Sequence, residues 1–319
     1  MDTQHWIEAV TGLQVRSGPE LVQELWSGFG RLERFHLSKG HVIVKAVDPG
    51  ARGGAPGHPR GWDTDLSAER KQKSYRVERV FYSEYALRLE EEARVPALIA
   101  ARETATGGEM ILEDLDAAGF AGRPRALEDG GIRACLGWLA RFHGAFLGSP
   151  TDGLWERGTY WHLETRPDEL EAIRGTPLGE AASDIDRRLS AAQHRTLVHG
   201  DAKLANFCFA PGAANGASAS VAAVDFQYVG GGVGVQDVAY FLGSCLDDGE
   251  LAAQAAPYLD LYFEALRSFP GCDAALEDEW RELWPHAWAD FHRFLAGWSP
   301  GHWKLSVYSE GMVRRIIAR

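Results

Sequence analysis

The sequence predicts an α+β protein in which a sheet-rich N-terminal lobe precedes a larger helical C-terminal lobe. Strand patterns punctuated by turn residues dominate up to about residue 114, and apolar residues at helical spacing dominate beyond it. A chain of 319 residues is long enough for two lobes. We therefore expect lobes at residues 1–114 and 115–319, joined through the segment LEDLD.

The N-terminal lobe is expected to be an antiparallel sheet with one long helix. The runs LVQELW, RLERFHL and HVIVKAV are separated by the turns SGFG and SKG, which is typical of three successive strands. Apolar residues at helical spacing predict a long helix over 67–92, and PALIAARETATGGEMILEDL predicts two more strands around a Thr-Gly-Gly turn. Residues 48–61 hold five Gly and three Pro, so we expect a mobile loop at 48–66 that could close over a substrate.

The C-terminal lobe is expected to be helical apart from one short hairpin. GGIRACLGWLARFHGAFLG, DELEAIRG, SDIDRRLSAAQH and the chain after Asp237 have helical patterns. FCF and VAAV instead predict two strands joined by the small-residue turn at 211–220. Asn206 precedes the first strand and Asp225 follows the second. Opposite positions of paired strands lie about 5 Å apart at Cβ, so both side chains should reach one shared cation.

Composition excludes several classes of function. The net charge of −12 argues against a general nucleic-acid binder, and it favours solubility or, less directly, a cationic substrate. The four cysteines are far apart and predict reduced, mostly buried thiols. The first residues do not form a basic, apolar leader and no segment predicts a spanning helix, so we expect a cytoplasmic protein.

Oxygen ligands at the end of the hairpin predict a magnesium site. Mg²⁺ prefers carboxylate and amide oxygens and is usually completed by water and substrate phosphates. Asp201 lies five residues before Asn206 in the same loop, close enough to accept the proton of an attacking hydroxyl. These residue types therefore favour phosphoryl transfer from a nucleotide.

The motifs HGDAKLAN (199–206) and VDF (224–226) resemble the catalytic and metal-binding segments of the aminoglycoside phosphotransferase and choline kinase-like superfamily, which shares the protein-kinase fold. Within that group, LVHGDAKLANF and AVDFQYVGGG most resemble the ecdysteroid kinase-like branch. The resemblance implies a bilobal protein-kinase-like fold with ATP and Mg²⁺ as cofactors. It also implies that Asp201 is the catalytic base and that Asn206 and Asp225 are the metal ligands.

Three charged residues complete the implied phosphate site. Lys45, in the third strand, resembles the lysine that holds the α and β phosphates. We expect its ionic partner to be Glu78 in VERVFY; Glu84 lies on another face of the helix. Lys203 could neutralise the γ-phosphate in the transition state, and a solvated loop lysine is an equally good interpretation.

Backbone groups are expected to bind the rest of the nucleotide. Gly28 and Gly30 in the turn GFG fit a glycine-rich loop over the phosphates, although Glu33 stands where a third glycine would be. The connector LEDL resembles the family's hinge, in which the backbone of Glu113 and Leu115 would bind adenine. An ordinary linker between lobes is compatible with that role.

Several other polar and aromatic residues are expected to be structural. His143 is expected to be a satisfied core histidine, and His199 to order the loop rather than transfer protons. Asp237 resembles the family's buried aspartate that anchors the catalytic loop through N–H groups. Core packing is the preferred interpretation of the tryptophans at 280–303, ahead of an aromatic box for a quaternary ammonium.

The function predicted from the sequence is transfer of the ATP γ-phosphate to a hydroxyl of a small molecule. The acceptor stays open among an amino alcohol, a sterol-like alcohol, a sugar and an aminoglycoside. A protein kinase is disfavoured by HGD in place of HRD, by DFQ in place of DFG and by the lack of an Ala-Pro-Glu segment. Further alternatives are a metallohydrolase using His199, Asp201 and Asp225, and a nucleotide-binding scaffold without activity.

Overall fold

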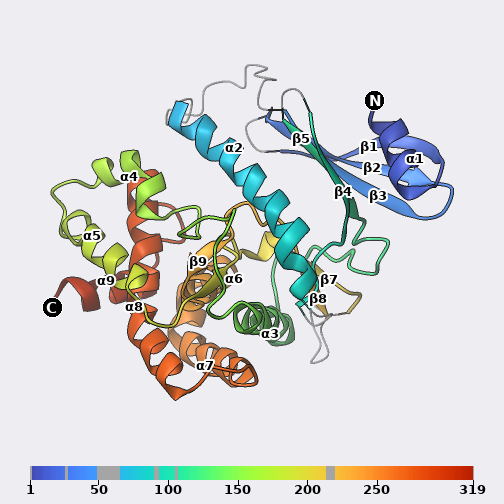
Figure 1. Ribbon diagram of the computed structural model, residues 1–319. Helices are drawn as coiled ribbons and strands as arrows, with labels where there is room; N and C mark the ends of the chain where they lie inside the picture. Colours follow the sequence, from blue (N-terminus) through green and yellow to red (C-terminus); the bar gives the residue numbers. More distant parts are fainter. Residues whose placement is uncertain are drawn as a thin grey trace.

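The computed structural model describes residues 2–25, 28–48, 65–89, 93–104, 107–212 and 220–318. Most of the loop predicted at 48–66 and most of the turn predicted at 211–220 lie outside the described residues. A sheet-rich lobe and a helical lobe are joined as the sequence predicts, with the long helix α2 (Asp65–Val80) lying between them (Figure 1).

The N-terminal lobe is a five-stranded antiparallel sheet with the order β1-β2-β3-β5-β4. The strands are β1 (Val15–Glu24), β2 (Gly30–Leu37), β3 (His41–Val47), β4 (Leu98–Glu103) and β5 (Gly108–Glu113). Strand β1 begins at Val15, before the predicted LVQELW. Every residue of β1 after Val15 is exposed, so no alternation of buried and exposed residues marks this strand in the sequence. Helix α1 (Thr3–Thr11) covers one face of the sheet through Trp6 and Ile7.

Helix α2 contacts both lobes. It continues into a π-helical turn, η2 (Phe81–Tyr85), and a 3-10 turn, η3 (Ala86–Arg88), so the long helix predicted at 67–92 is present with a changed pitch at its end. The Phe81 ring stacks on Phe226 of the helical lobe, with centroids 3.9 Å apart. Val77 and Phe81 belong to the same large apolar core as the helices of the C-terminal lobe. Packing therefore fixes α2 against the helical lobe.

Helices form most of the C-terminal lobe, as predicted. They are α3 (Asp129–Ala145), α4 (Pro167–Ala172), α5 (Pro177–Ser190), α6 (Val235–Cys245), α7 (Asp248–Leu266), α8 (Ala274–Trp298) and α9 (Val307–Ile317). Trp280, Trp284 and Trp288 of α8 are buried, so core packing accounts for the first part of the tryptophan cluster. Trp303, beyond the helix, is instead 63% exposed.

Two short antiparallel strand pairs hold the loops at the cleft. Strand β6 (Thr196–Val198) pairs with β9 (Gly230–Gly232). Strand β7 (Phe207–Phe209) pairs with β8 (Val221–Ala223), which confirms the predicted hairpin. The 3-10 turn η6 (Leu204–Asn206) leads directly into β7. Both pairs are buried, so the segment 199–203, which lies between β6 and η6, is held on a rigid base.

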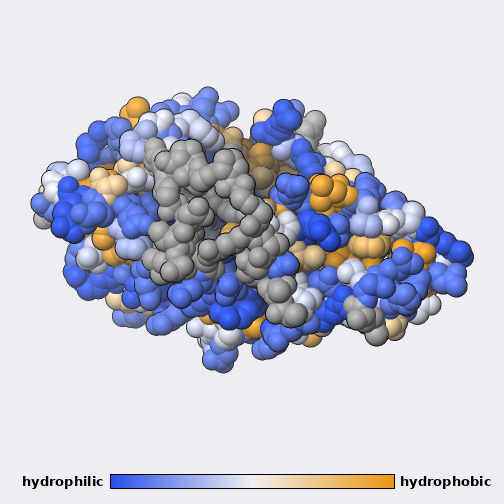
Figure 2. Space-filling view, turned by 90° about the horizontal axis from the view of Figure 1, so that it is seen from above, coloured by the Kyte–Doolittle hydropathy of each residue, from blue (hydrophilic) through white to orange (hydrophobic). Residues whose placement is uncertain are grey.

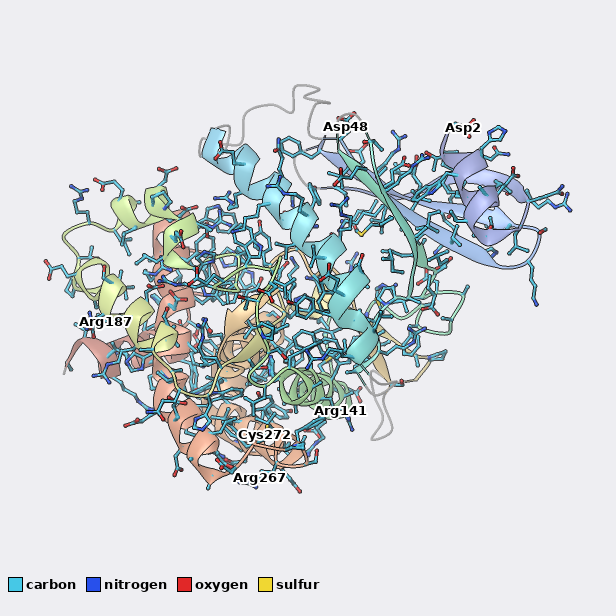
Figure 3. All side chains as sticks on the ribbon, in the orientation of Figure 1. Asp2, Asp48, Arg141, Arg187, Arg267 and Cys272 are labelled. Atoms are coloured by element: carbon cyan, nitrogen blue, oxygen red, sulfur yellow. The ribbon has the colours of Figure 1, made fainter. Side chains whose placement is uncertain are left out.

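The described residues on the face seen in Figure 2 are mostly hydrophilic, with hydrophobic residues in small groups. No helix within the described residues is long and apolar enough to cross a membrane. The cysteines are free thiols; Cys272, in the turn between α7 and α8, lies at the far end of the helical lobe from the sheet (Figure 3).

Candidate active site

The β7–β8 hairpin brings Asn206 and Asp225 to one end, as the sequence predicts. Phe207 pairs with Ala223, and the Val224 N–H donates to the Asn206 carbonyl at 3.0 Å, which extends the ladder by one step. Asp225 then takes a left-handed backbone conformation with φ of 71°. That turn ends the strand and is tolerated by aspartate better than by most residues. The two predicted metal ligands thus follow from local hairpin geometry.

The loop that carries Asp201 is fixed by the buried side chain of Asp237. Asp237 accepts the N–H of His199 at 2.6 Å and the N–H of Gly200 at 3.0 Å. His143 bonds to the same carboxylate at 3.1 Å through Nε2 and to the Tyr262 hydroxyl at 2.8 Å through Nδ1. Asp237 therefore has the loop-anchoring contacts that its sequence context suggests, and His143 is a buried histidine with both ring nitrogens satisfied.

His199 orders the loop through both nitrogens of its ring. Nε2 donates to the Val224 carbonyl at 3.0 Å, and Nδ1 accepts the Asp201 N–H at 3.2 Å. The residue between them has to be glycine, because Gly200 has φ of 80° and an added Cβ would lie 2.1 Å from the Tyr228 carbonyl oxygen. This steric demand explains HGD in place of HRD.

Three donors orient the Asp201 carboxylate. Oδ2 accepts hydrogen bonds from Lys203 Nζ at 2.8 Å and from Asn206 Nδ2 at 3.1 Å. Oδ1 accepts one from the Tyr240 hydroxyl at 3.0 Å. A carboxylate offers about four lone-pair positions, so one acceptor position is left for a further proton donor. Asp201 is thus held in a fixed orientation while it retains the capacity to accept a proton.

Lys45 and Glu78 form a buried ion pair between β3 and α2. Lys45 Nζ lies 2.8 Å and 2.6 Å from the two carboxylate oxygens of Glu78, whereas Glu84 is exposed on the opposite side of the helix. Asp225 Oδ1 lies 3.6 Å from the same ammonium. Burial alone would lower the pKa of Lys45, but the Glu78 and Asp225 carboxylates outweigh it and raise that pKa. The ammonium is therefore charged throughout the neutral range.

The Asp225 carboxylate fits a cation site. Burial would raise its pKa, but Lys45, Lys203 and Lys71 outweigh burial and lower it, so the group is ionised near neutral pH. Its Oδ1 atom is buried and accepts no hydrogen bond from the protein, and its ion-pair partner Lys45 lies 3.6 Å away. An ionised oxygen without a donor is costly unless something binds it. Asn206 makes both of its side-chain hydrogen bonds through Nδ2, which leaves its carbonyl branch for a ligand. These oxygens suit Mg²⁺.

The residues of the metallohydrolase alternative do not form a metal site. Both nitrogens of His199 are occupied by the Val224 carbonyl and the Asp201 N–H, so no lone pair faces Asp201 or Asp225. Among the described residues no group of three or more His, Cys, Asp or Glu side chains could hold a metal ion. The described contacts of His199 therefore do not support the metallohydrolase alternative at these residues.

The segments predicted to be the hinge and the glycine turn both adjoin the sheet of the N-terminal lobe. Asp114, within the hinge, is buried and ion-paired with Arg34 of β2 at 2.6 Å. The Leu115 carbonyl accepts the Phe120 N–H at 2.8 Å. The backbone group of Leu115 that could bind adenine is therefore its N–H. The Glu113 N–H donates to the Ala97 carbonyl at 2.9 Å, so this group is already engaged within the lobe.

Gly28 lies between β1 and β2, and Gly30 is the first residue of β2. At Gly30 an added Cβ would lie 2.1 Å from the Ala46 carbonyl oxygen of β3. Strand packing therefore requires a glycine at this position whether or not phosphate binds above it. The glycine at position 30 is thus explained by strand packing, in addition to the proposed contact with phosphate.

Two features of the site have no reliable signal in the sequence. Tyr240 of α6 reaches Asp201, and its hydroxyl also lies 3.3 Å from that of Tyr160. Gln227, which follows VDF, accepts hydrogen bonds from Lys71 at 2.6 Å and from Ser74 at 3.3 Å, both on α2. The departure from DFG marks Gln227 as unusual, but its partners lie far away in the chain and only the fold reveals them.

The structure resembles several solved kinases over nearly its whole length. It matches a microcompartment-associated aminopropanol kinase with a TM-score of 0.54 and 14% identity, covering 100% of this chain and 99% of the other. It matches an amicoumacin kinase, solved with AMP-PNP and Ca²⁺, with a TM-score of 0.53 and 15% identity, covering 100% and 92%. It matches the ethanolamine kinase of Plasmodium vivax with a TM-score of 0.50 and 13% identity, covering 93% and 81%.

These likenesses confirm the class of fold: α+β, bilobal and protein-kinase-like, as found in small-molecule kinases. The narrower resemblance is to the ecdysteroid kinase-like family, whose model matches residues 159–269. That segment contains both the HGD and the VDF motifs, so the resemblance predicted from the sequence is confirmed. No curated protein matches the chain.

Proposed function

We propose that this protein is an ATP-dependent phosphotransferase that transfers the γ-phosphate to a hydroxyl of a small molecule. The observation that carries the proposal is the convergence of Lys45, Asp201, Asn206 and Asp225 from β3, the catalytic loop and the β7–β8 hairpin. Lys45 Nζ lies 3.6 Å from Asp225, and Asn206 Nδ2 lies 3.1 Å from Asp201. This combination of an ammonium, a positioned carboxylate and an oxygen pair is what phosphoryl transfer requires.

Asn206 and Asp225 would hold Mg²⁺ in this proposal. When bound, the ion would neutralise negative charge on the phosphates. The buried Asp225 Oδ1 without a donor and the oxygen-only ligand set support this assignment. Lys45 would bind the α and β phosphates, with Glu78 keeping its ammonium in place. Lys203, beside Asp201, would face the charge that develops on the transferred group.

Residues 1–114 would bind the nucleotide in this proposal, and residues 115–319 would supply the catalytic loop and the acceptor pocket. The Glu113 carbonyl and the Leu115 N–H would bind adenine. Gly28 and Gly30 would lie over the phosphates, although Gly30 is needed for strand packing in any case.

Asp201 would act as the base. The acceptor hydroxyl forms a bond to the γ-phosphorus, the bond from that phosphorus to the ADP oxygen breaks, and the hydroxyl proton passes to Asp201. Tyr240, Lys203 and Asn206 fix the carboxylate, so little reorientation is needed at the moment of transfer. The reaction needs no activated serine or cysteine nucleophile, because the acceptor supplies the attacking oxygen.

The geometry of the segment after VDF favours a small acceptor over a protein. Residues 226–234 lead directly from Asp225 into α6, which begins at Val235. Gln227 in this segment is tied to α2, and its backbone carbonyl accepts the Trp155 Nε1–H at 2.8 Å. A short segment with these anchors offers no extended surface for a peptide, so the protein-kinase alternative is less well supported.

The proposal is tested by following ADP release with Mg²⁺-ATP and a panel of small alcohols. We expect Mg²⁺-ATP to raise the melting temperature of the wild type, by an amount set by the ratio of nucleotide to its Kd. Asp225→Ala should lose most of this shift because a metal ligand is gone. Asp278→Ala, an exposed change on α8, is the matched control and should keep the shift.

Absence of any Mg²⁺-ATP stabilisation at millimolar nucleotide would refute nucleotide binding. Stabilisation that Asp225→Ala leaves intact would refute the metal assignment alone. Nucleotide binding without phosphate transfer to any alcohol would favour the scaffold alternative.

A further inference from the structure

Lys304, which belongs to none of the motifs named above, contacts the ring of a tyrosine, Tyr240, whose hydroxyl bonds to the predicted base Asp201. Lys304 follows α8, in the segment that leads to α9, and its Nζ lies 4.7 Å from the centre of the Tyr240 ring. The hydroxyl of that tyrosine bonds to Asp201. Phe291 and Trp303 lie at 5.7 Å and 5.5 Å from the same ammonium. Lys304 thus lies on an aromatic wall on the acceptor side of the site.

No carboxylate among the described residues pairs with Lys304, whereas Lys45 pairs with Glu78 and Lys203 with Asp201. Burial lowers the pKa of Lys304 to about 8; Asp201 partly offsets this, and Lys203 adds to it. A partly buried ammonium without a counter-ion is a costly arrangement. It becomes favourable when a ligand brings the missing negative charge.

Acidic residues near Lys304 are already engaged elsewhere. A cavity of about 400 Å³ is lined by Lys304 and Trp303 together with Asp247, Asp248 and Glu250. Asp247 and Glu250 cap α7 through reciprocal bonds to backbone N–H groups, and Asp248 accepts the N–H groups of Val307 and Tyr308. All three acids are exposed to solvent, where water weakens their pull on a ligand. Lys304 is less exposed to solvent than these three acids, so its positive charge acts more strongly on a ligand in this cavity.

We propose that Lys304 selects the phosphate acceptor by binding an anionic group on it, so that the substrate is a hydroxylated small acid with an apolar body. This inference rests on the proposed function and adds the chemical class of its acceptor. The anionic group would lie against Lys304, the apolar body against Tyr240 and Trp303, and the hydroxyl at Asp201. A protonated amine in the same place would meet Lys304 and Lys203 and be repelled.

The inference is tested with sets of acceptors that share a carbon skeleton and a hydroxyl and carry a carboxylate, a hydroxyl or an amine at the same terminal carbon. The sets are glucuronate, glucose and 6-amino-6-deoxyglucose; 3-phenyllactate, 3-phenyl-1,2-propanediol and 1-amino-3-phenyl-2-propanol; and 3-hydroxybutyrate, 1,3-butanediol and 4-amino-2-butanol. ADP release gives kcat/KM for each, and calorimetry with a non-hydrolysable ATP analogue gives binding without turnover. Lys304→Met keeps the aliphatic reach without the charge, Lys304→Arg keeps the charge, and Lys39→Met, in the exposed β2–β3 turn, is the control.

We expect the acid of at least one set to exceed its neutral and amine counterparts by tenfold or more in kcat/KM. Lys304→Met should remove that preference through KM, with kcat and ATP binding nearly unchanged. Lys304→Arg should restore it, and Lys39→Met should behave as the wild type. A purely structural role would instead lower kcat and melting temperature for all acceptors alike.

The outcomes separate this inference from the proposed function. If amines or neutral alcohols are preferred, or if Lys304→Met leaves the ranking unchanged, the inference is wrong while the kinase activity stands. If no acid binds the wild type more tightly than it binds Lys304→Met, the inference is wrong as well. Failure to bind Mg²⁺-ATP at all would overturn the proposed function itself.

Discussion

The two sides of the proposed cleft differ in how the charge of a lysine is compensated. On the proposed nucleotide side, Lys45 is buried, lies within 2.8 Å of both carboxylate oxygens of Glu78 and has Asp225 3.6 Å away. On the proposed acceptor side, the partly buried Lys304 lies near three aromatic rings and pairs with no carboxylate of the described residues. The first charge is compensated by the protein. The second has to be compensated by solvent or by a ligand.

The difference distinguishes the groups that bind the nucleotide, which any kinase of this fold needs, from the groups that select the acceptor, which vary from one protein to another. Every ATP-dependent transfer handles the same triphosphate, so its binding groups can be held by permanent ion pairs. The acceptor varies, so the groups that choose it have to be free to meet it. The contrast makes four predictions, from the largest expected effect to the smallest.

Asp201→Asn should abolish most of the transfer and leave nucleotide binding intact. The amide keeps the shape of the side chain but cannot take a proton, and general-base catalysis contributes about 10²- to 10⁴-fold. The measurement is kcat for ADP release together with the melting shift produced by Mg²⁺-ATP. Asp278→Asn serves as the control. Retention of full kcat in Asp201→Asn would show that the proton goes elsewhere.

Glu78→Gln should destabilise the fold by about 3 kcal/mol, the low end for breaking a buried pair, because Asp225 still faces Lys45. Urea unfolding monitored by circular dichroism measures the change. Glu84→Gln, two helical turns further along and exposed, should change the free energy of unfolding by less than about 0.5 kcal/mol. Equal effects of the two variants would mean that the ion pair does not organise α2.

Tyr240→Phe should lower kcat by about tenfold with little change in the KM for ATP. It removes one hydrogen bond to the Asp201 carboxylate, and a bond to a charged group contributes about 1.5–3 kcal/mol. Tyr258→Phe, which loses a hydroxyl bond to Asp129 of α3, is the matched control and should leave kcat unchanged. A Tyr240→Phe variant with unchanged kcat would show that Lys203 and Asn206 suffice to hold Asp201.

The pH dependence should report the charge on Lys304. Because its pKa is about 8, kcat/KM for an acidic acceptor should fall as pH rises through 8, when the ammonium loses its proton. The ionisable groups that act on it are Asp201, Lys203 and Cys245, and burial raises the pKa of the Cys245 thiol to about 12. Lys304→Arg should flatten the profile, since arginine stays charged. A decline of equal size in Lys304→Arg would assign the titration to another group.

The residues of the proposed nucleotide side could be predicted from the sequence, whereas those of the proposed acceptor side could not. The β7–β8 hairpin follows from apolar runs around a small-residue turn, and it alone places Asn206 and Asp225 together. Glu78 could be chosen over Glu84 because it stands four residues before the tyrosine of the FY pair, as in the family that the motifs resemble, and because Glu84 lies on another helix face. Tyr240 and Lys304 could not be chosen. They come from α6 and from the segment after α8, and sequence spacing says nothing of how such distant segments pack.

The sequence by itself determined the hairpin, the long helix and the order of the two lobes, because these depend on periodicity and turn chemistry within short stretches. It also determined the residue types of the proposed phosphate site, because HGD and VDF are short motifs that can be recognised in the chain. Only the tertiary structure decided which side chains face Asp201 and which lysine has no carboxylate partner. Pairing of charges depends on distances between elements far apart in the chain, and packing alone sets those distances.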